Sequence, residues 1–196
     1  WWGLHTVKRI SAGGAMASTA IHILDAALWV AGSPDPLTVS GSTHKLFPGK
    51  RLETAPSSEA RDSYDVEDIA VAHIRLSDDI SLILEGTWAH ELHQSQYSFE
   101  MICEGGTISL SPLTILMDEG GEIVDRTKDY ADSTAGGGGW GESVDWQIAR
   151  FVTAIRTGEA PSQTPRELRN LQRIQDAIYQ SASTGREVRL DAEMPL

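Results

Sequence analysis

The chain has 196 residues, with 16 Lys and Arg against 28 Asp and Glu, so its formal net charge is −12. Nucleic acids and anionic membranes both attract clustered positive charge, and this balance argues against either as a partner. Hydrophobic residues make up 40% of the sequence, which is enough for a domain with a proper core. We therefore expect a single domain over residues 1–196.

The cellular compartment is indicated by what the sequence lacks. No uncharged apolar run reaches the roughly 18 to 20 residues that a membrane span needs. The most apolar segment, 14–31, contains His22 and Asp25 and has no basic region before it, so it does not read as a signal peptide. The lone Cys103 cannot form an internal disulfide, which favours a reducing compartment. We expect a cytoplasmic protein.

Residues 13–32 predict one long helix that is apolar nearly all round. At 100° per residue, the polar exceptions fall within a stripe about 60° wide; they are Ser18, His22, Asp25 and Trp29. A helix that is apolar on most of its circumference is buried, and its polar groups then need partners. The stripe therefore indicates one of two things. His22 is a satisfied core histidine bonded to Asp25, or it lines a polar cavity and faces a substrate.

A sheet follows this helix. Strands are predicted over 36–46, 66–77, 79–89, 96–104, 107–110, 113–118 and 122–126. The polar pair Asp78-Asp79 indicates a tight hairpin turn, and 48–64 reads as a long exposed loop. Asp65, Glu67 and Asp68 read most simply as a solvated turn before a strand. Because no helix long enough for a parallel crossover lies among these strands, the sheet should be mainly antiparallel.

Two helices close the chain, over 143–157 and 165–183. The first has an apolar face made of Val144, Ile148, Phe151, Val152 and Ile155. The second opens with a capping box, Thr164 and Glu167, and should bury Leu168, Leu171, Ile174 and Ile178. Three apolar helix faces need one surface to cover. We therefore predict an α+β fold in which an open, mostly antiparallel sheet carries helices 14–31, 143–157 and 165–183 on one face.

The opposite face of that sheet is the predicted subunit interface. Alternation places Ala70, Ala72, Ile74 and Leu76 toward the core and Val71, His73 and Arg75 on the other side. In the next strand, Ser81, Ile83, Glu85 and Thr87 share that other side. A mixture of apolar and polar residues suits a protein contact better than a bare solvent face, so we expect a homo-oligomer.

Neither a metal site nor a phosphate-binding loop is predicted. His90 and His93 lie three residues apart without an obvious third ligand. No apolar strand leads into the glycine cluster Gly136 to Gly139, which therefore reads as a flexible loop. The chain begins at Trp1-Trp2, residues with which a natural soluble domain rarely starts, and we expect a fragment of a longer protein.

The pattern from Gly13 to Gly32 resembles a known family. It reads Gly13-Gly14, then Ser18, His22, Asp25, Trp29 and Gly32. It is similar to the start of the C-terminal, substrate-side domain of the Gfo/Idh/MocA oxidoreductases, whose usual form is GGG-x-x-x-D-x-G-x-H-x-x-D. Ser18 replaces the usual Asp, and Ala20 replaces the usual Gly. Further matches follow in the family's order along nearly the whole chain: LTVSGST at 37–43, DVED at 65–68, EGTWA at 85–89 and the ending 151–188.

The resemblance implies an activity. Family members transfer hydride between a secondary alcohol, typically of a sugar or cyclitol, and NAD or NADP. The cofactor is held mainly by an N-terminal Rossmann domain that is absent from this chain, so the chain alone should be inactive. The remaining domain should have the fold of the C-terminal domain of glyceraldehyde-3-phosphate dehydrogenase. One alternative is a non-catalytic sugar-binding relative, because Ser18 lacks the usual carboxylate. The other is a relative whose main role is assembly, because the sheet of this family's domain commonly forms the subunit interface.

The resemblance also assigns roles to residues. His22 matches the family's acid/base histidine, and Ser18 occupies the slot of a carboxylate that orients substrate or tunes the histidine. Asp25 either orients the imidazole or anchors the helix to the sheet. Lys8 shortly precedes the helix and is expected near the site. Trp88 either stacks on a sugar or belongs to the core or an interface.

Overall fold

The computed structural model describes residues 5–46, 62–88, 96–131 and 140–190. The chain divides into two compact units, Trp1–Ser95 with Arg169–Leu196, and Gln96–Leu168. The single domain over 1–196 stays a prediction. Several expectations lie outside the described residues: the start at Trp1-Trp2, most of the loop 48–64, the pair His90 and His93, and the cluster Gly136 to Gly139.

The first unit contains a four-stranded antiparallel sheet of order β3-β2-β1-β8. Its strands are β1 (Pro36–His44), β2 (Ile69–Leu76), β3 (Ser81–Thr87) and β8 (Val188–Arg189). Asp78 and Asp79 have φ angles of 59° and 58°, the left-handed values of a tight two-residue hairpin turn. The predicted hairpin between β2 and β3 is confirmed, whereas β8 was not foreseen.

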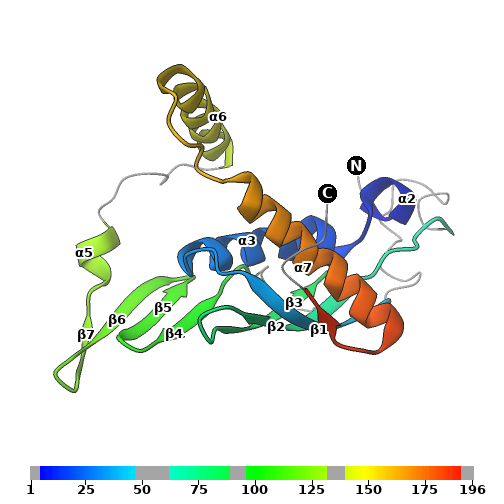
Figure 1. Cartoon of the computed structure of the whole chain (residues 1–196), viewed down its shortest axis with the longest axis horizontal. Coiled ribbons are helices and arrows are strands. Elements are labelled where there is room, and N and C mark those ends of the chain that lie inside the picture. Colours follow the sequence, from blue (N-terminus) through cyan, green and yellow to red (C-terminus); the bar gives the residue numbers. More distant parts are fainter. Residues whose placement is uncertain (1–4, 47–61, 89–95, 132–139, 191–196) are drawn as a thin grey trace. The chain divides into compact units, whose positions relative to one another are not determined.

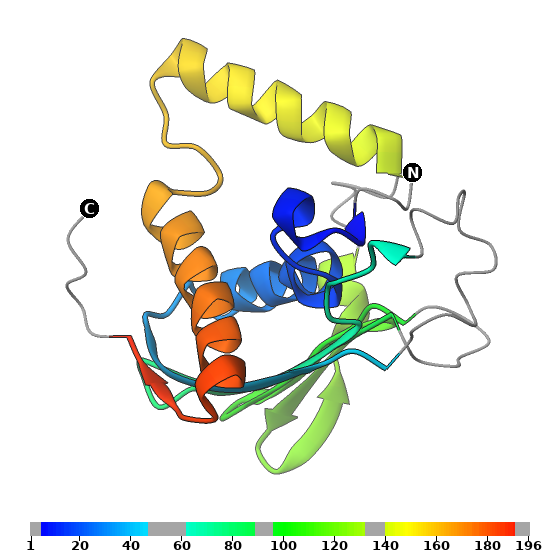
Figure 2. The ribbon, with the colours of Figure 1, turned by 90° about the vertical axis from the view of Figure 1, so that its right-hand side faces the viewer.

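Helices cover one face of this sheet. The short α2 (Lys8–Ser11) is followed by a π-helical turn, η1 (Met16–Ala20), which continues directly into α3 (Ile21–Val30). The last helix is α7 (Pro165–Thr184), and Figures 1 and 2 show α3 and α7 crossing the same side of the sheet. Their shared core includes Met16, Leu24, Val39, Ile74, Ile174 and Ile178. The buried Ser181 hydroxyl links α7 to β1, because it accepts the Gly41 amide at 2.9 Å.

The second unit contains a meander of four antiparallel strands. These are β4 (Glu100–Cys103), β5 (Gly106–Leu110), β6 (Leu113–Glu119) and β7 (Glu122–Asp125), paired in chain order. The small helix α5 (Thr127–Ala131) follows β7, and α6 (Trp140–Thr157) belongs to the same unit. The Arg126 guanidinium between β7 and α5 pairs with Glu119 of β6 at 2.5 Å.

The predicted class, α+β with antiparallel strands, is confirmed. The strands divide between two hydrogen-bonded sheets where the sequence led us to expect one, because alternation predicts neighbouring pairs but not where a ladder ends. The predicted burial of the 143–157 face is wrong, since Ile148, Phe151 and Ile155 of α6 are 57%, 60% and 68% exposed. Amphipathicity shows that a face is apolar, not what covers it. Leu168, at the start of α7, is also exposed, whereas Ile174 and Ile178 are buried as predicted.

One segment is long and apolar enough to cross a membrane, contrary to the expectation from the sequence. This segment is Lys8–Val30, and 44% of its most apolar part is buried inside the protein. It is not one continuous helix, because α2 ends at Ser11 and η1 begins at Met16. Since Met16, Ala20, Leu24 and Leu28 belong to the hydrophobic core, packing within the fold accounts for the apolar character of this segment.

Candidate active site

The helix that carries the predicted stripe begins with an irregular turn. The Ile21 amide donates to the Met16 carbonyl, five residues earlier, which defines the π-helical turn η1. Such single π turns inside α-helices occur often at functional sites. A uniform rotation of 100° per residue could not predict it.

A buried carboxylate holds the start of this helix. Glu67, only 9% exposed, accepts hydrogen bonds at its Oε1 atom from the amides of Gly14 at 2.8 Å and Met16 at 3.0 Å. Its backbone carbonyl accepts the Ala15 amide at 3.0 Å. The first amides of a helix lack partners within the helix, and a negative charge is favourable beside them. Glu67 therefore works as a cap supplied by the segment that leads into β2.

Tyr179 of α7 completes this cap. Its hydroxyl donates to Glu67 Oε1 at 2.9 Å. Burial, the charge of Glu67 and the hydrogen bond to Glu67 all raise the pKa of the Tyr179 hydroxyl, so the neutral phenol is favoured. Glu67 thus engages the backbone of Gly14, Ala15 and Met16, and Tyr179 holds the Glu67 carboxylate. We call this arrangement the Glu67–Tyr179 clamp.

The clamp explains why two glycines precede the helix. A Cβ atom added to Gly14 would lie 1.8 Å from the Glu67 carbonyl oxygen, and one added to Gly13 would lie 1.9 Å from the Tyr179 hydroxyl. No side chain fits at such distances, so only glycine lets the backbone approach this closely.

The expectation of a solvated acidic turn at 65–68 is wrong in two places. Besides Glu67, Asp68 is fully buried, and its two carboxylate oxygens accept the Leu46 amide at 2.8 and 3.0 Å. Burial and the charges of Asp68 and Glu67 raise the pKa of the nearby Tyr64 hydroxyl. Asp65 behaves differently, since its carboxylate makes an exposed bond to the Lys8 amide at 2.5 Å. The sequence alone could not distinguish the buried capping carboxylates Glu67 and Asp68 from the exposed Asp65, because all three are acidic residues within four positions of one another.

The middle of the π turn is held from the sheet side. The indole Nε1 of Trp88 donates to the Thr19 hydroxyl at 2.8 Å, and the Ser18 hydroxyl donates to the Gly14 carbonyl at 2.9 Å. Trp88 and Ser18 are both half-buried. The structure therefore brings Ser18 and Trp88, two predicted site residues, to the same turn.

The stripe itself faces away from the core. His22 is exposed, Asp25 is half-buried and Trp29 is 63% exposed, while Ala20, Leu24 and Leu28 pack on the sheet. The reading of His22 as a satisfied core histidine is therefore wrong, as is the expectation of a helix buried nearly all round. The imidazole stands one turn beyond the clamped start, on the open side of the helix.

Lys8 lies near the clamp. Its ammonium is 5.9 Å from the centroid of the Tyr179 ring, and the side chain is exposed. An exposed cation over an aromatic face is weakly held and remains accessible.

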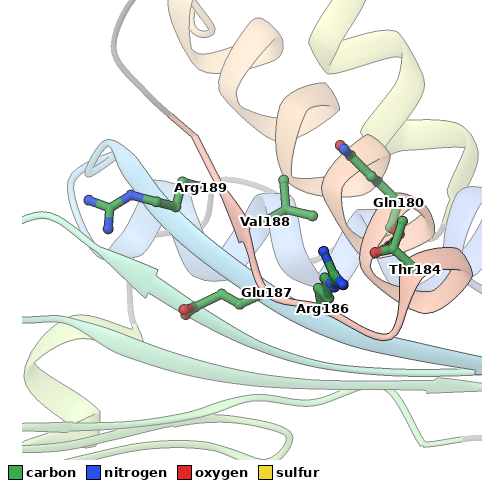
Figure 3. A pocket seen from close by; sticks show the side chains of 6 residues that line it. All are labelled: Gln180, Thr184, Arg186, Glu187, Val188 and Arg189. Atoms are coloured by element: carbon green, nitrogen blue, oxygen red, sulfur yellow. Dashed lines mark hydrogen bonds between the residues drawn. The ribbon is translucent and has the colours of Figure 1, made fainter.

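A shallow hollow of about 520 Å³ lies elsewhere, at the β8 edge of the first sheet (Figure 3). Its lining residues come from the end of α7 and from β8: Gln180, Thr184, Arg186, Glu187, Val188 and Arg189. None of the predicted site residues lines it, and η1 contacts β3 at the other edge of the sheet. In the part of the chain that the structure describes, no cluster of three His, Cys, Asp or Glu residues could hold a metal ion.

Comparison with known proteins supplies the family. A sequence profile of the GFO/IDH/MocA C-terminal domain matches residues 2–109, more than half of the chain. The chain belongs to the GFO/IDH/MocA family. D-glucoside 3-dehydrogenase of Escherichia coli (strain K12) is 24% identical over 191 residues, which cover 96% of this chain and 52% of that protein. The chain thus spans about half the length of the curated relative it matches.

Solved structures share the fold. Levoglucosan dehydrogenase in complex with NADH and levoglucosan superposes with a TM-score of 0.74 at 21% identity, over 97% of this chain and 54% of that one. The aldose-aldose oxidoreductase from Caulobacter crescentus, complexed with glycerol, gives a TM-score of 0.67 at 19% identity, over 97% of this chain and 51% of that one. At these identities the likeness shows the fold alone.

Proposed function

We propose that this GFO/IDH/MocA chain is the substrate-side domain of an NAD(P)-dependent dehydrogenase that oxidises a secondary alcohol of a sugar or cyclitol. The observation that carries the proposal is the position of His22. Its imidazole is exposed on the open side of a helix whose first turn is held by Glu67 and Tyr179. A general base must reach the hydroxyl proton it removes, and a fixed backbone keeps it in reach.

The chain's own residues supply the proton side of this reaction. As the alcohol carbon loses hydride, its hydroxyl proton passes to the His22 imidazole, a group suited to taking and returning a proton near neutral pH. Ser18, one turn earlier, is placed to hydrogen-bond the substrate if its hydroxyl leaves the Gly14 carbonyl. Asp25, one turn later, is proposed to orient the imidazole, and the exposed Lys8 and half-buried Trp88 are proposed to contact the sugar.

The cofactor is NAD or NADP, which accepts the hydride when bound. The residues of this chain do not fit its pyrophosphate, because the dinucleotide fingerprint requires a strand that runs into a glycine-rich turn. Here the last described element before Gly136 is the helix α5, not a strand. We therefore propose that the cofactor is held mainly by a separate N-terminal domain and that this chain alone is inactive.

The substrate class is proposed from the relatives. One is named as a dehydrogenase of D-glucosides, and a structural neighbour was solved with levoglucosan and NADH. The natural first probes are therefore levoglucosan and an alkyl glucoside, each with NAD⁺ and with NADP⁺.

His22→Ala in the full-length enzyme tests the proposal. We expect kcat for NAD(P)⁺ reduction to fall by roughly 10²- to 10⁴-fold, the usual contribution of a general acid or base. His44→Ala is the matched control, because His44 is an exposed histidine at the end of β1, outside the face of β2 and β3 proposed below as a subunit interface. A His22→Ala enzyme with unchanged kcat would contradict the proposal, and so would equal losses in the two variants.

Ser18 keeps a second candidate open, a sugar-binding relative without turnover. The residue has no charge to tune the imidazole, unlike the carboxylate that the family pattern has in this slot. Binding of a sugar by the full-length protein, without NAD(P)⁺ reduction on any probe, favours this candidate over the enzyme.

We also propose that the protein is a cytoplasmic homo-oligomer that associates through the outer face of β2 and β3. On this face Ile83 is 81% exposed and Val71 is 39% exposed, and His73 pairs directly with Ile83 across the strands. The face therefore combines exposed aliphatic and polar side chains, a mixed composition that suits a protein contact. Light scattering of the wild-type protein and of Ile83→Asp should give an oligomer and a smaller species, respectively. A wild-type monomer at micromolar concentrations would contradict this proposal.

A further inference from the structure

We propose that Glu67 and Tyr179 are positioning residues for catalysis, which set the placement of His22 through the π turn. This inference rests on the proposed function, since it assigns a role relative to His22. Neither side chain touches the imidazole in the described structure. Both act on the backbone from which the helix starts.

One short segment before the π turn is held by several hydrogen bonds. The amides of Gly14, Ala15 and Met16 all donate to Glu67, and the Tyr179 hydroxyl donates to the same Glu67 Oε1 atom. The Ser18 amide then donates to the Gly14 carbonyl at 3.0 Å. A typical capping side chain satisfies one or two amides of a helix start. Here the capping carboxylate is itself held by a side chain from a separate element, so this start is fixed more firmly than by a single cap.

The clamp lies directly before an irregular piece of backbone, the π turn η1. A π turn inserts an additional residue into the helical ladder and changes the direction of every side chain after it. His22 is the second residue beyond η1. A shift in how the π turn closes therefore rotates the imidazole relative to the sheet, and misplacement of a catalytic group by about 1 Å can cost a hundredfold in rate.

The clamp also joins three parts of the first unit. Glu67, just before β2, bonds to the backbone before η1, and Tyr179 of α7 bonds to Glu67. Trp88, just after β3, fixes Thr19 in the same turn at 2.8 Å. The backbone that leads to His22 is thus held in place by bonds to the sheet and to α7. A precise catalytic site needs rigid support of this kind.

The test uses Glu67→Gln and Tyr179→Phe in the full-length enzyme, assayed with an alkyl glucoside and NAD⁺. Asp68→Asn is the matched control, because Asp68 is the neighbouring buried carboxylate and its two oxygens accept the Leu46 amide instead of amides at the helix start. We expect Glu67→Gln and Tyr179→Phe to lower kcat by roughly tenfold or more, with the KM for NAD⁺ unchanged within about twofold, the pattern of a lost transition-state interaction. Asp68→Asn should lower the melting temperature comparably and keep kcat within about twofold.

Coupling provides a second readout. Because the two residues act through one clamp, the double variant should lose no more kcat than the worse single variant. Amide hydrogen exchange at residues 14–17 should accelerate in both clamp variants and not in Asp68→Asn. If Glu67→Gln does not fold, Tyr179→Phe carries the test, because it deletes a single oxygen atom.

Three results would overturn the inference: unchanged kcat in both clamp variants, equal kcat losses in Glu67→Gln and Asp68→Asn, or fully additive losses in the double variant. His22→Ala, measured in the same series, separates the two proposals. If it keeps its activity, the proposed function fails and this inference fails with it. If it loses activity while the clamp variants keep theirs, only the positioning role fails.

Discussion

The two halves of the helix formed by η1 and α3 differ sharply in how they are held. At its start, the backbone amides of Gly14, Ala15 and Met16 are bonded to Glu67, which Tyr179 holds in turn, and the segment is largely buried. Further on, His22 and Trp29 are exposed on the open side. The contrast teaches that one element can combine a fixed base with an accessible working face. Polar groups that are buried must be fully satisfied, whereas the exposed ones remain available to a substrate.

Gly14→Ala, in the clamped half, should cause the largest loss of stability. The added methyl would overlap the Glu67 carbonyl oxygen, so we expect a loss of about 3 kcal/mol or more in the free energy of unfolding, at or beyond the usual cost of overpacking. Trp29→Ala on the open half is the control and should cost less than about 1 kcal/mol, because the ring is 63% exposed. Urea unfolding followed by circular dichroism measures both, and equal losses would show that the two halves are held alike.

Alkaline pH should weaken the clamped half selectively. Burial and neighbouring carboxylates raise the pKa of Tyr179 and of Tyr64 above the ordinary value of 10.0. Because the unfolded chain then loses these protons at lower pH than the folded one, the stability they confer is complete below about pH 10 and is lost as pH rises further.

Melting temperatures from pH 8 to 11.5 check this prediction. Tyr179→Phe and Tyr64→Phe should each flatten the alkaline decline, while Tyr130→Phe, at an exposed residue of α5, should leave it unchanged. The same slope in all four proteins would count against buried phenols as its cause.

The smallest effect is expected for Ser18→Asp, at the boundary between the two halves. Ser18 is half-buried, and its hydroxyl donates to the Gly14 carbonyl, four residues earlier in the same helix start. Losing that bond should cost roughly 0.5 to 1.5 kcal/mol, and the protein should remain folded. A loss in the free energy of unfolding as large as that of Gly14→Ala would show that the Ser18 side chain faces the dry core, and would contradict this prediction.

Much of the fold could be predicted from the sequence, because its signals are local. Alternation located β1 to β7 but not β8, and the turn at Asp78-Asp79 was read from residue types alone. The capping box of Thr164 and Glu167 was read in the same way and has bonds of 2.6 and 3.3 Å. The splitting of the sheet and the exposure of α6 depend on what covers each surface, which no local pattern contains.

The site was predictable only in part, for a related reason. The stripe of Ser18, His22, Asp25 and Trp29 was derived from a uniform rotation that the π turn interrupts, and the exposure of His22 and Trp29 could not be read from an apolar circumference. Glu67 and Tyr179 were missed because they lie 112 residues apart and meet only in the folded chain. One signal could have indicated them: a pair of glycines before a helix, where a close backbone approach by another group is the physical reason to exclude a side chain.

A crystal structure of the full-length enzyme with NAD⁺ and a bound alkyl glucoside would test the central claim most directly. We expect an imidazole nitrogen of His22 to lie within about 2.6 to 3.2 Å of the hydroxyl that is oxidised, because a general base must be within hydrogen-bond reach of the proton it removes. We also expect Glu67 still to accept the amides of Gly14 and Met16. A His22 side chain pointing into solvent, with a different residue at the reacting hydroxyl, would contradict this claim.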